Sequence, residues 1–293
     1  MKKWLNIFIY ISLAFLLYAL WKADYLKIPE IENYFYLALS IAFLLCGYIT
    51  KSIVWTKGLK SENIQVGLKD GIASTGIAEL GKYIPGKLWV LMGRALFISS
   101  HYPISTARAS AISLNVQMLT VWSGLLVGLI GMLFIAVPLN WIIPMVLGWM
   151  ALSVVLYVKK IHDLFLKLLR RISKRDIQIP FINVMKQKEI LFWLFFDWLI
   201  RMTAFYLLII SLSDFSLNYA VALGFPLAVT LGILAIIVPG GMGVREGVLG
   251  IWLKNAGLGI EMATSIAVFA RLWSLLGELM VFIVGIILRH LKK

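Results

Sequence analysis

Long runs of hydrophobic residues alternate with short polar segments along most of the chain. Six of these runs approach the roughly 20 residues that an α-helix needs to cross the hydrocarbon core of a bilayer. The six runs are residues 4–21, 34–54, 109–137, 141–158, 191–212 and 263–288. Aromatic residues near several run ends, among them Trp55, are typical of the interfacial belts of membrane proteins. The pattern predicts an all-α polytopic membrane protein with six full spans.

Two further regions, residues 64–100 and 219–255, are apolar but broken by proline and glycine. Lipid offers no partner to the backbone groups that a break exposes, so irregular backbone persists at depth only inside protein or beside water. We expect each region to form a broken hairpin inside the protein. The sequence leaves open whether each is re-entrant or a pair of short full spans, which would give eight or more helices.

Basic residues between the runs predict the orientation. Lys51, Lys57 and Lys60, the segment 159–175 and both ends of the chain are lysine- and arginine-rich, whereas the opposite loops are acidic or neutral. The positive-inside rule then predicts an inner-membrane protein with cytoplasmic N- and C-termini. The first hairpin would enter from the cytoplasm and the second from the outside. Segment 159–176 has helical apolar spacing and is expected to lie on the inner leaflet, although a solvated basic loop explains most of the same pattern.

The order of elements repeats. Span, span, broken hairpin and span occur in residues 1–137 and again in residues 138–293. Three net crossings separate equivalent points, so the two repeats are expected to be inverted. In transporters with inverted repeats, paired segments interrupted by Pro or Gly indicate a substrate site near the bilayer midplane.

Composition narrows the function. With 61% hydrophobic residues in 293, a soluble protein is excluded. The net charge of +14 is spread over loops between apolar runs, which favours anionic lipid as the partner and not nucleic acid. The single cysteine, Cys46, and three scattered histidines give no metal cluster or disulfide. Catalytic motifs are also absent from the sequence, so neither an enzyme activity nor a cofactor is expected.

Charged residues and broken backbone in the two hairpins and two later runs form the candidate substrate site. A Pro-Gly turn brings a helix N-terminus into the protein, where free N–H groups attract anions, and arginine matches phosphate through its planar fork. The alternatives are snorkelling for the two lysines and structural ion pairs for Asp197–Arg201 and Arg271–Glu278, which share helix faces. The candidate residues are Glu79, Lys82, Tyr83, Pro85, Gly86, Lys87, Arg94, Asp197, Arg201, Pro239, Gly240, Gly241, Gly243, Arg245, Glu246, Arg271 and Glu278.

Small residues four apart predict close helix packing. They occur at Gly124 and Gly128, and again at Gly243 and Gly247.

Two motifs resemble those of the lysylphosphatidylglycerol synthase transmembrane family, whose members are flippase-like proteins. They are Glu79-Leu80-Gly81-Lys82-Tyr83-Ile84-Pro85-Gly86-Lys87-Leu88-Trp89 with Gly93-Arg94, and Pro239-Gly240-Gly241-Met242-Gly243-Val244-Arg245-Glu246-Gly247. The resemblance covers nearly the whole chain and implies a lipid-translocating membrane unit. It also implies a stand-alone member that lacks the soluble aminoacyl-transferase domain and does not synthesise lysyl-lipid itself. Similar stand-alone proteins are associated with glycosyltransferases and with polyprenyl-linked or hopanoid lipids.

These observations predict a transporter that moves a phosphate-bearing lipid headgroup across the inner membrane by alternating access. The lipid would be a phospholipid or a polyprenyl-phosphate-linked glycan. Two alternatives are a non-transporting membrane partner of a glycosyltransferase, docked through residues 159–175, and an intramembrane lipid-modifying enzyme.

Overall fold

The computed structural model describes residues 30–84, 89–173, 181, 184–212, 217–235 and 238–291. These residues form ten α-helices and three short 3-10 turns, without a strand, so the predicted all-α fold is confirmed. Five helices are long and apolar enough to cross a membrane: α2 (Tyr34–Ser61), α5 (Thr106–Gly131), α6 (Leu139–Tyr157), α8 (Val184–Ser211) and α11 (Ile260–His290). They match five of the six predicted spans, and the sixth, residues 4–21, lies outside the described residues.

Helix α2 begins where Asn33 caps it, because the Asn33 side chain accepts hydrogen bonds from the amides of Phe35 and Tyr36. It ends at Ser61, later than the predicted limit at residue 54. Lys57 and Lys60 therefore lie inside a helix and not in a loop, and Lys51 lies in the same helix. Trp55 is fully buried, and its indole N–H donates to Ser74 Oγ at 3.1 Å, so the predicted interfacial position for Trp55 is wrong.

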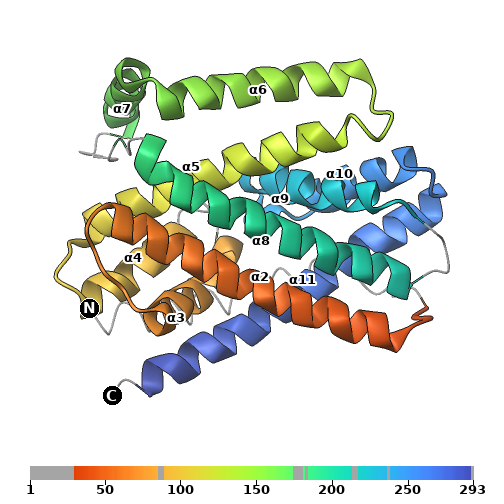
Figure 1. The fold of residues 1–293 in the computed structure, drawn as a ribbon, viewed down its shortest axis with the longest axis horizontal. Coiled ribbons are helices and arrows are strands. Elements are labelled where there is room, and N and C mark those ends of the chain that lie inside the picture. Colours follow the sequence, from red (N-terminus) through yellow and green to blue (C-terminus); the bar gives the residue numbers. More distant parts are fainter. Residues whose placement is uncertain are drawn as a thin grey trace.

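Four short helices form two pairs. Helices α3 (Leu68–Glu79) and α4 (Trp89–His101) lie in the left half of Figure 1, and α9 (Gly224–Leu234) and α10 (Val244–Asn255) lie in the right half. With 11 to 13 residues each, these helices are about 17–20 Å long. A hydrocarbon core is about 30 Å thick, so each is too short to cross it alone.

The two pairs contact each other at their inner ends. The 3-10 turn η1 (Leu80–Tyr83) follows α3, and η3 (Pro239–Gly241) lies between α9 and α10. The two turns touch. Gly240 has φ 62°, and a Cβ there would lie 2.8 Å from Arg271 Nη2 and 2.9 Å from Tyr83 Cε1. A glycine is therefore needed both for the left-handed backbone and for this close approach.

The long helices pack against each short pair. Helix α3 packs on α11 and α2, and α9 packs on α5. The predicted close packing at Gly124 and Gly128 is confirmed, since a Cβ on Gly128 would lie 2.8 Å from Leu227 Cδ1 and one on Gly124 would overlap Thr230. The same prediction is wrong for Gly243 and Gly247, where a Cβ would meet nothing within 4 Å.

A hydrogen bond joins the outer ends of α3 and α4. The Tyr102 hydroxyl, just after α4, donates a hydrogen bond to Asp70 in the first turn of α3. Burial and this hydrogen bond raise the pKa of Tyr102, so the hydroxyl stays protonated and able to donate at physiological pH.

Helix α6 lies along the top of Figure 1 and packs on α5 and on α7 (Lys159–Ser173). Residues 174–176 of the predicted amphipathic segment lie outside the described residues.

Candidate functional site

Charged side chains from both halves of the molecule meet where the two turns touch. Glu79, at the end of α3, is 3% exposed. Its carboxylate accepts from Lys51 Nζ at 2.6 Å and from Lys82 Nζ at 2.8 Å. The same Lys82 ammonium lies 2.5 Å from Glu278 Oε1 on α11, and Glu278 is 1% exposed. Lys82 is therefore shared by two buried carboxylates and joins the first short pair to the last helix.

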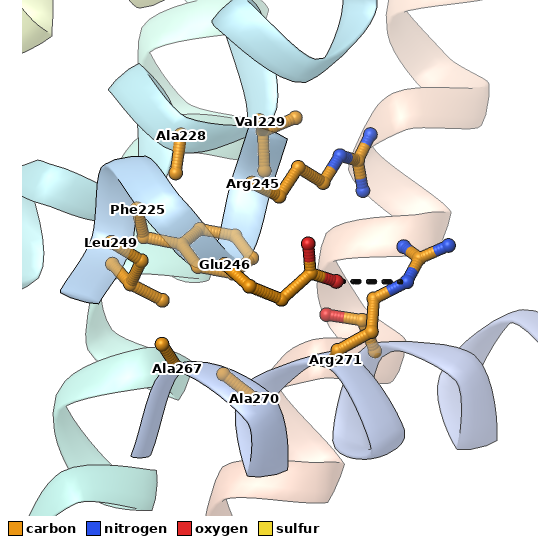
Figure 2. Close-up of a pocket in the computed structure, with 10 residues that line it drawn as sticks. Phe225, Ala228, Val229, Arg245, Glu246, Leu249, Ala267, Ala270 and Arg271 are labelled. Carbon is orange, nitrogen blue, oxygen red and sulfur yellow. Dashed lines mark ion pairs between the residues drawn. The ribbon is translucent and has the colours of Figure 1, made fainter. Parts of the chain in front are cut away.

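Tyr83 extends this network toward the second turn. Its hydroxyl donates to Glu278 Oε2 at 2.7 Å and accepts from Arg271 Nη2 at 2.8 Å. Arg271 is also near two carboxylates: its Nε lies 3.6 Å from Glu246 Oε1, and its Nη1 lies 3.8 Å from Glu278 Oε1. Figure 2 draws the ion pair between Arg271 and Glu246. These contacts connect α3, η1, α11 and α10 in one chain of alternating charge.

An arginine lies near each end of this charged chain. Arg94, on α4, is 3% exposed and lies over the Trp55 ring at 5.6 Å. Arg245, on α10, packs over Gly232 of α9, and its buried Nε has no hydrogen-bond partner. Among the described residues, neither guanidinium is within ion-pair distance of a carboxylate.

The charge balance of the site is positive. Five cations, Lys51, Lys82, Arg94, Arg245 and Arg271, accompany three carboxylates, Glu79, Glu246 and Glu278. Five minus three leaves an excess of two positive charges within the described residues. An unpaired charge out of water costs several kcal/mol, and an anion or water that reaches the arginines would remove that cost. The arrangement is thus chemically suited to hold an anion.

A pocket lies beside Arg245, Glu246 and Arg271, between α9, α10 and α11. It encloses about 290 Å³ of empty space including its open mouth. Arg245, Glu246, Arg271 and Ser274 supply its polar lining, and the remaining lining is apolar. In Figure 2 the two guanidinium groups lie on one side, and Phe225, Leu249 and Ala267 lie on the other. One end of the pocket therefore suits a charged group and the other a hydrocarbon group.

Asp197 and Arg201, both sequence candidates, lie at the edge of this network, since Arg201 and Lys51 both lie over the Tyr48 ring, at 5.0 and 5.8 Å. They pair with each other at 2.9 Å on α8, as their spacing predicts. Asp197 also accepts from Thr50 Oγ1 at 2.6 Å, and Arg201 Nη2 donates to the Gly47 carbonyl at 2.6 Å. All of these partners lie in the interface of α8 with α2, so the geometry resembles a structural ion pair.

The remaining candidates divide into three groups. Pro85, Gly86 and Lys87 lie outside the described residues. Pro239 begins η3, and α10 starts at Val244, after the three glycines. Gly240 and Gly241 have positive φ and occupy the contact between the turns, and Gly243, with φ 77°, precedes α10.

Lys51 was missed as a site residue. Its position near the end of a hydrophobic run made it look like part of a basic loop. The sequence contains a pattern that identifies Lys51 as a candidate: Tyr48, Lys51 and Trp55 are spaced three and four residues apart and therefore share a helix face. In the structure that face points toward α3 and its terminal Glu79.

Comparison with protein families gives one match that spans most of the chain. A family model described as "Lysylphosphatidylglycerol synthase TM region" matches residues 4–285. Comparisons with curated proteins and with solved structures find no match.

Proposed function

The chain belongs to the lysylphosphatidylglycerol synthase TM region family, which indicates a function connected with membrane lipids, and from this premise we propose that it moves the phosphate-bearing headgroup of a lipid across the membrane. The single observation that carries the proposal is the pair of arginines, Arg94 and Arg245, without a carboxylate partner among the described residues. Each follows a Pro-Gly pair in the sequence. A phosphate would supply the charge that each guanidinium lacks.

The pocket supports a lipid as the source of that phosphate. Arg245 and Arg271 line the same space as Phe225, Leu249 and Ala267. A free ion would gain nothing from the apolar wall, whereas a lipid can bury hydrocarbon there while its phosphate contacts the arginines. The headgroup would cross in protein and the tails would stay in the bilayer.

The contacts between the two halves of the chain are those that would open and close during transport. Lys82–Glu278, Tyr83–Glu278 and Arg271–Tyr83 join the first short pair to the last helix. Alternating access requires these contacts to open and close as one half rocks against the other. During that movement a phosphate would replace a carboxylate as the partner of Lys82 or Arg271. Each cation would then keep a counter-charge in the low-dielectric interior.

The same proposal includes the arrangement in the membrane. We treat α3–α4 and α9–α10 as re-entrant hairpins in inverted repeats, residues 1–137 and 138–293, because all four helices are short and their turns touch. We assign an inner-membrane location with cytoplasmic termini. In support, α7 and the C-terminal end of α11 lie at the same end of the molecule in Figure 1, and both carry basic residues.

Reconstitution tests this function. Purified protein is placed in liposomes with an acyl-labelled fluorescent phosphatidylglycerol, and dithionite quenching reports the label in the outer leaflet. Arg94→Gln and Arg245→Gln should each slow headgroup exchange at least about tenfold, since a charge-assisted hydrogen bond contributes roughly 1.5–3 kcal/mol. Arg108→Gln is the matched control, because that arginine is 57% exposed at the start of α5.

The alternatives have distinct outcomes in the same assay. Headgroup exchange no faster than in protein-free liposomes would contradict the proposal and favour a non-transporting partner of a glycosyltransferase. Exchange that both substitutions leave unaffected would contradict the role of the two arginines. A lipid recovered with altered mass would instead favour an intramembrane lipid-modifying enzyme. The basic α7 helix is the surface through which such a partner would dock.

A further inference from the structure

The pocket between α9, α10 and α11 offers few polar groups. Its polar lining consists of Arg245, Glu246, Arg271 and Ser274. Three of these four are charged, so Ser274 is the one neutral hydroxyl that lines it. The other lining side chains are Phe225, Ala228, Val229, Leu249, Ala267 and Ala270, and none of these can form a hydrogen bond.

A headgroup rich in hydroxyls fits this lining poorly. Each hydroxyl taken out of water needs a hydrogen-bond partner, and one that lacks a partner costs free energy. A sugar or inositol ring brings several hydroxyls at once. Hydroxyls on the side away from the two guanidinium groups and Glu246 would face the alanines and Phe225 (Figure 2).

The charged lining of the pocket indicates the same class of ligand. A phosphomonoester carries about −1.5 to −2 charges at neutral pH. The two guanidinium groups that line the pocket, Arg245 and Arg271, can pair with that charge and with the three acceptor oxygens of a terminal phosphate, whereas a phosphodiester supplies one charge.

In Figure 2 the Glu246 carboxylate, which pairs with Arg271, is the polar group between the apolar wall and the two guanidinium groups. A ligand that spans both must therefore carry hydrocarbon close to its phosphate. We propose that the preferred ligand is a lipid phosphomonoester, in which a terminal phosphate is the whole headgroup and is joined directly to the lipid backbone or an isoprenoid chain. This inference rests on the proposed function and narrows its substrate from lipids that contain phosphate to lipids that end in phosphate.

The test is a headgroup series with constant dioleoyl tails. Binding to the detergent-purified full chain is measured for phosphatidic acid, phosphatidylglycerol, phosphatidylinositol and diacylglycerol, with inorganic phosphate as the tail-free probe. Phosphatidic acid should bind at least about tenfold more tightly than phosphatidylglycerol, which corresponds to one strong charge-assisted contact. Phosphatidylinositol should bind more weakly still. Diacylglycerol and inorganic phosphate should each bind at least about tenfold more weakly than phosphatidic acid, because one lacks the anion and the other the tail.

Variants assign the preference to the pocket. Arg245→Gln should reduce the ratio between phosphatidic acid and phosphatidylglycerol, and Arg108→Gln should leave it unchanged. Phosphatidylinositol that binds as tightly as phosphatidic acid would overturn the inference.

The outcomes also separate this inference from the proposed function. Equal binding of all three phospholipids, with transport that still needs Arg245, would refute the monoester preference and leave lipid transport intact. Failure of every phospholipid to bind would contradict both. Selective binding of phosphatidic acid without any transport would refute the transport function alone.

Discussion

Tyr83 connects the two halves of the molecule through one hydroxyl group. It donates to Glu278 and accepts from Arg271, while its ring packs against Gly240 of the opposite turn. The side chain is 2% exposed, so water cannot take over these hydrogen bonds. A phenylalanine would keep the ring contacts and remove both hydrogen bonds.

We expect Tyr83→Phe to destabilise the protein by about 1–3 kcal/mol, because a buried carboxylate and a buried guanidinium each lose a partner. The apparent melting temperature in detergent measures this effect. Tyr34→Phe is the control, since Tyr34 is 71% exposed and should shift stability by no more than about 0.5 kcal/mol. Equal melting temperatures for the two variants would show that the Tyr83 hydroxyl does not join the halves.

Gly240 and Gly247 form a second pair for comparison. Alanine at Gly240 meets Arg271 and Tyr83 and must adopt φ 62°, a conformation that costs roughly 1–2 kcal/mol for a side chain with Cβ. Gly247 lies within α10 with open space around it, and alanine there should be neutral or stabilise the helix by up to about 1 kcal/mol. We expect thermal unfolding to rank Gly240→Ala well below wild type and Gly247→Ala at or above it. The reverse order would contradict the described contact between the turns.

The sequence predicted ion pairs within one helix and missed those between helices. The spacings of Asp197–Arg201 and Arg271–Glu278 put each pair on one helix face, and both pairs form. Lys51 and Glu79 are 28 residues apart in the chain, and hydropathy says nothing about such a contact. The burial of Trp55 was missed for the same reason, since Ser74, its partner, belongs to another helix.

At the level of helices, α2 and α8 make an extensive interface around Asp197 and Arg201. Breaking a buried ion pair by removing one partner costs about 3–5 kcal/mol, whereas replacing both partners by apolar residues is often neutral. We therefore expect Asp197→Leu and Arg201→Met to be strongly destabilising alone, and the double variant to recover most of the lost stability. The melting temperatures of the four proteins in this cycle measure the coupling.

Lipid transport by the double variant decides the role of this pair. If the pair is structural, the stable double variant should transport at a rate close to that of wild type. A double variant that melts like wild type and yet fails to transport would put Asp197 and Arg201 in the substrate path.

The positions of the breaks between the short helices could be predicted from the sequence, but the backbone conformation at the breaks could not. Proline and glycine in an apolar region give the positions of both breaks, and the described pairs, 68–101 and 224–255, lie close to the predicted limits. The start of α10 at Val244 follows from positive φ at Gly240, Gly241 and Gly243. A sequence does not specify how many residues such glycines keep out of the helix.

Across the whole molecule, the arrangement of helices predicts which ends face each compartment. Lys69 lies in the first turn of α3 and Lys160 lies on α7, whereas Glu261 lies in the first turn of α11, and all three are exposed. In a Cys46→Ala background, single cysteines at Lys69 and Lys160 should react with an impermeant maleimide only after cells are permeabilised. A cysteine at Glu261 should react in intact cells. Labelling of Lys69 and Glu261 from the same side would contradict opposite entry of the two hairpins.

The central claim is that Arg245 and Arg271 hold the phosphate of a lipid between α9, α10 and α11. The most direct test is the distance from the lipid phosphorus to the Arg245 guanidinium in an experimental structure determined with saturating anionic phospholipid. The account predicts phosphate oxygens within about 3 Å of Arg245, with hydrocarbon density along Phe225, Leu249 and Ala267. A pocket without phosphate, in which Arg245 pairs with an acidic side chain of the protein, would contradict it.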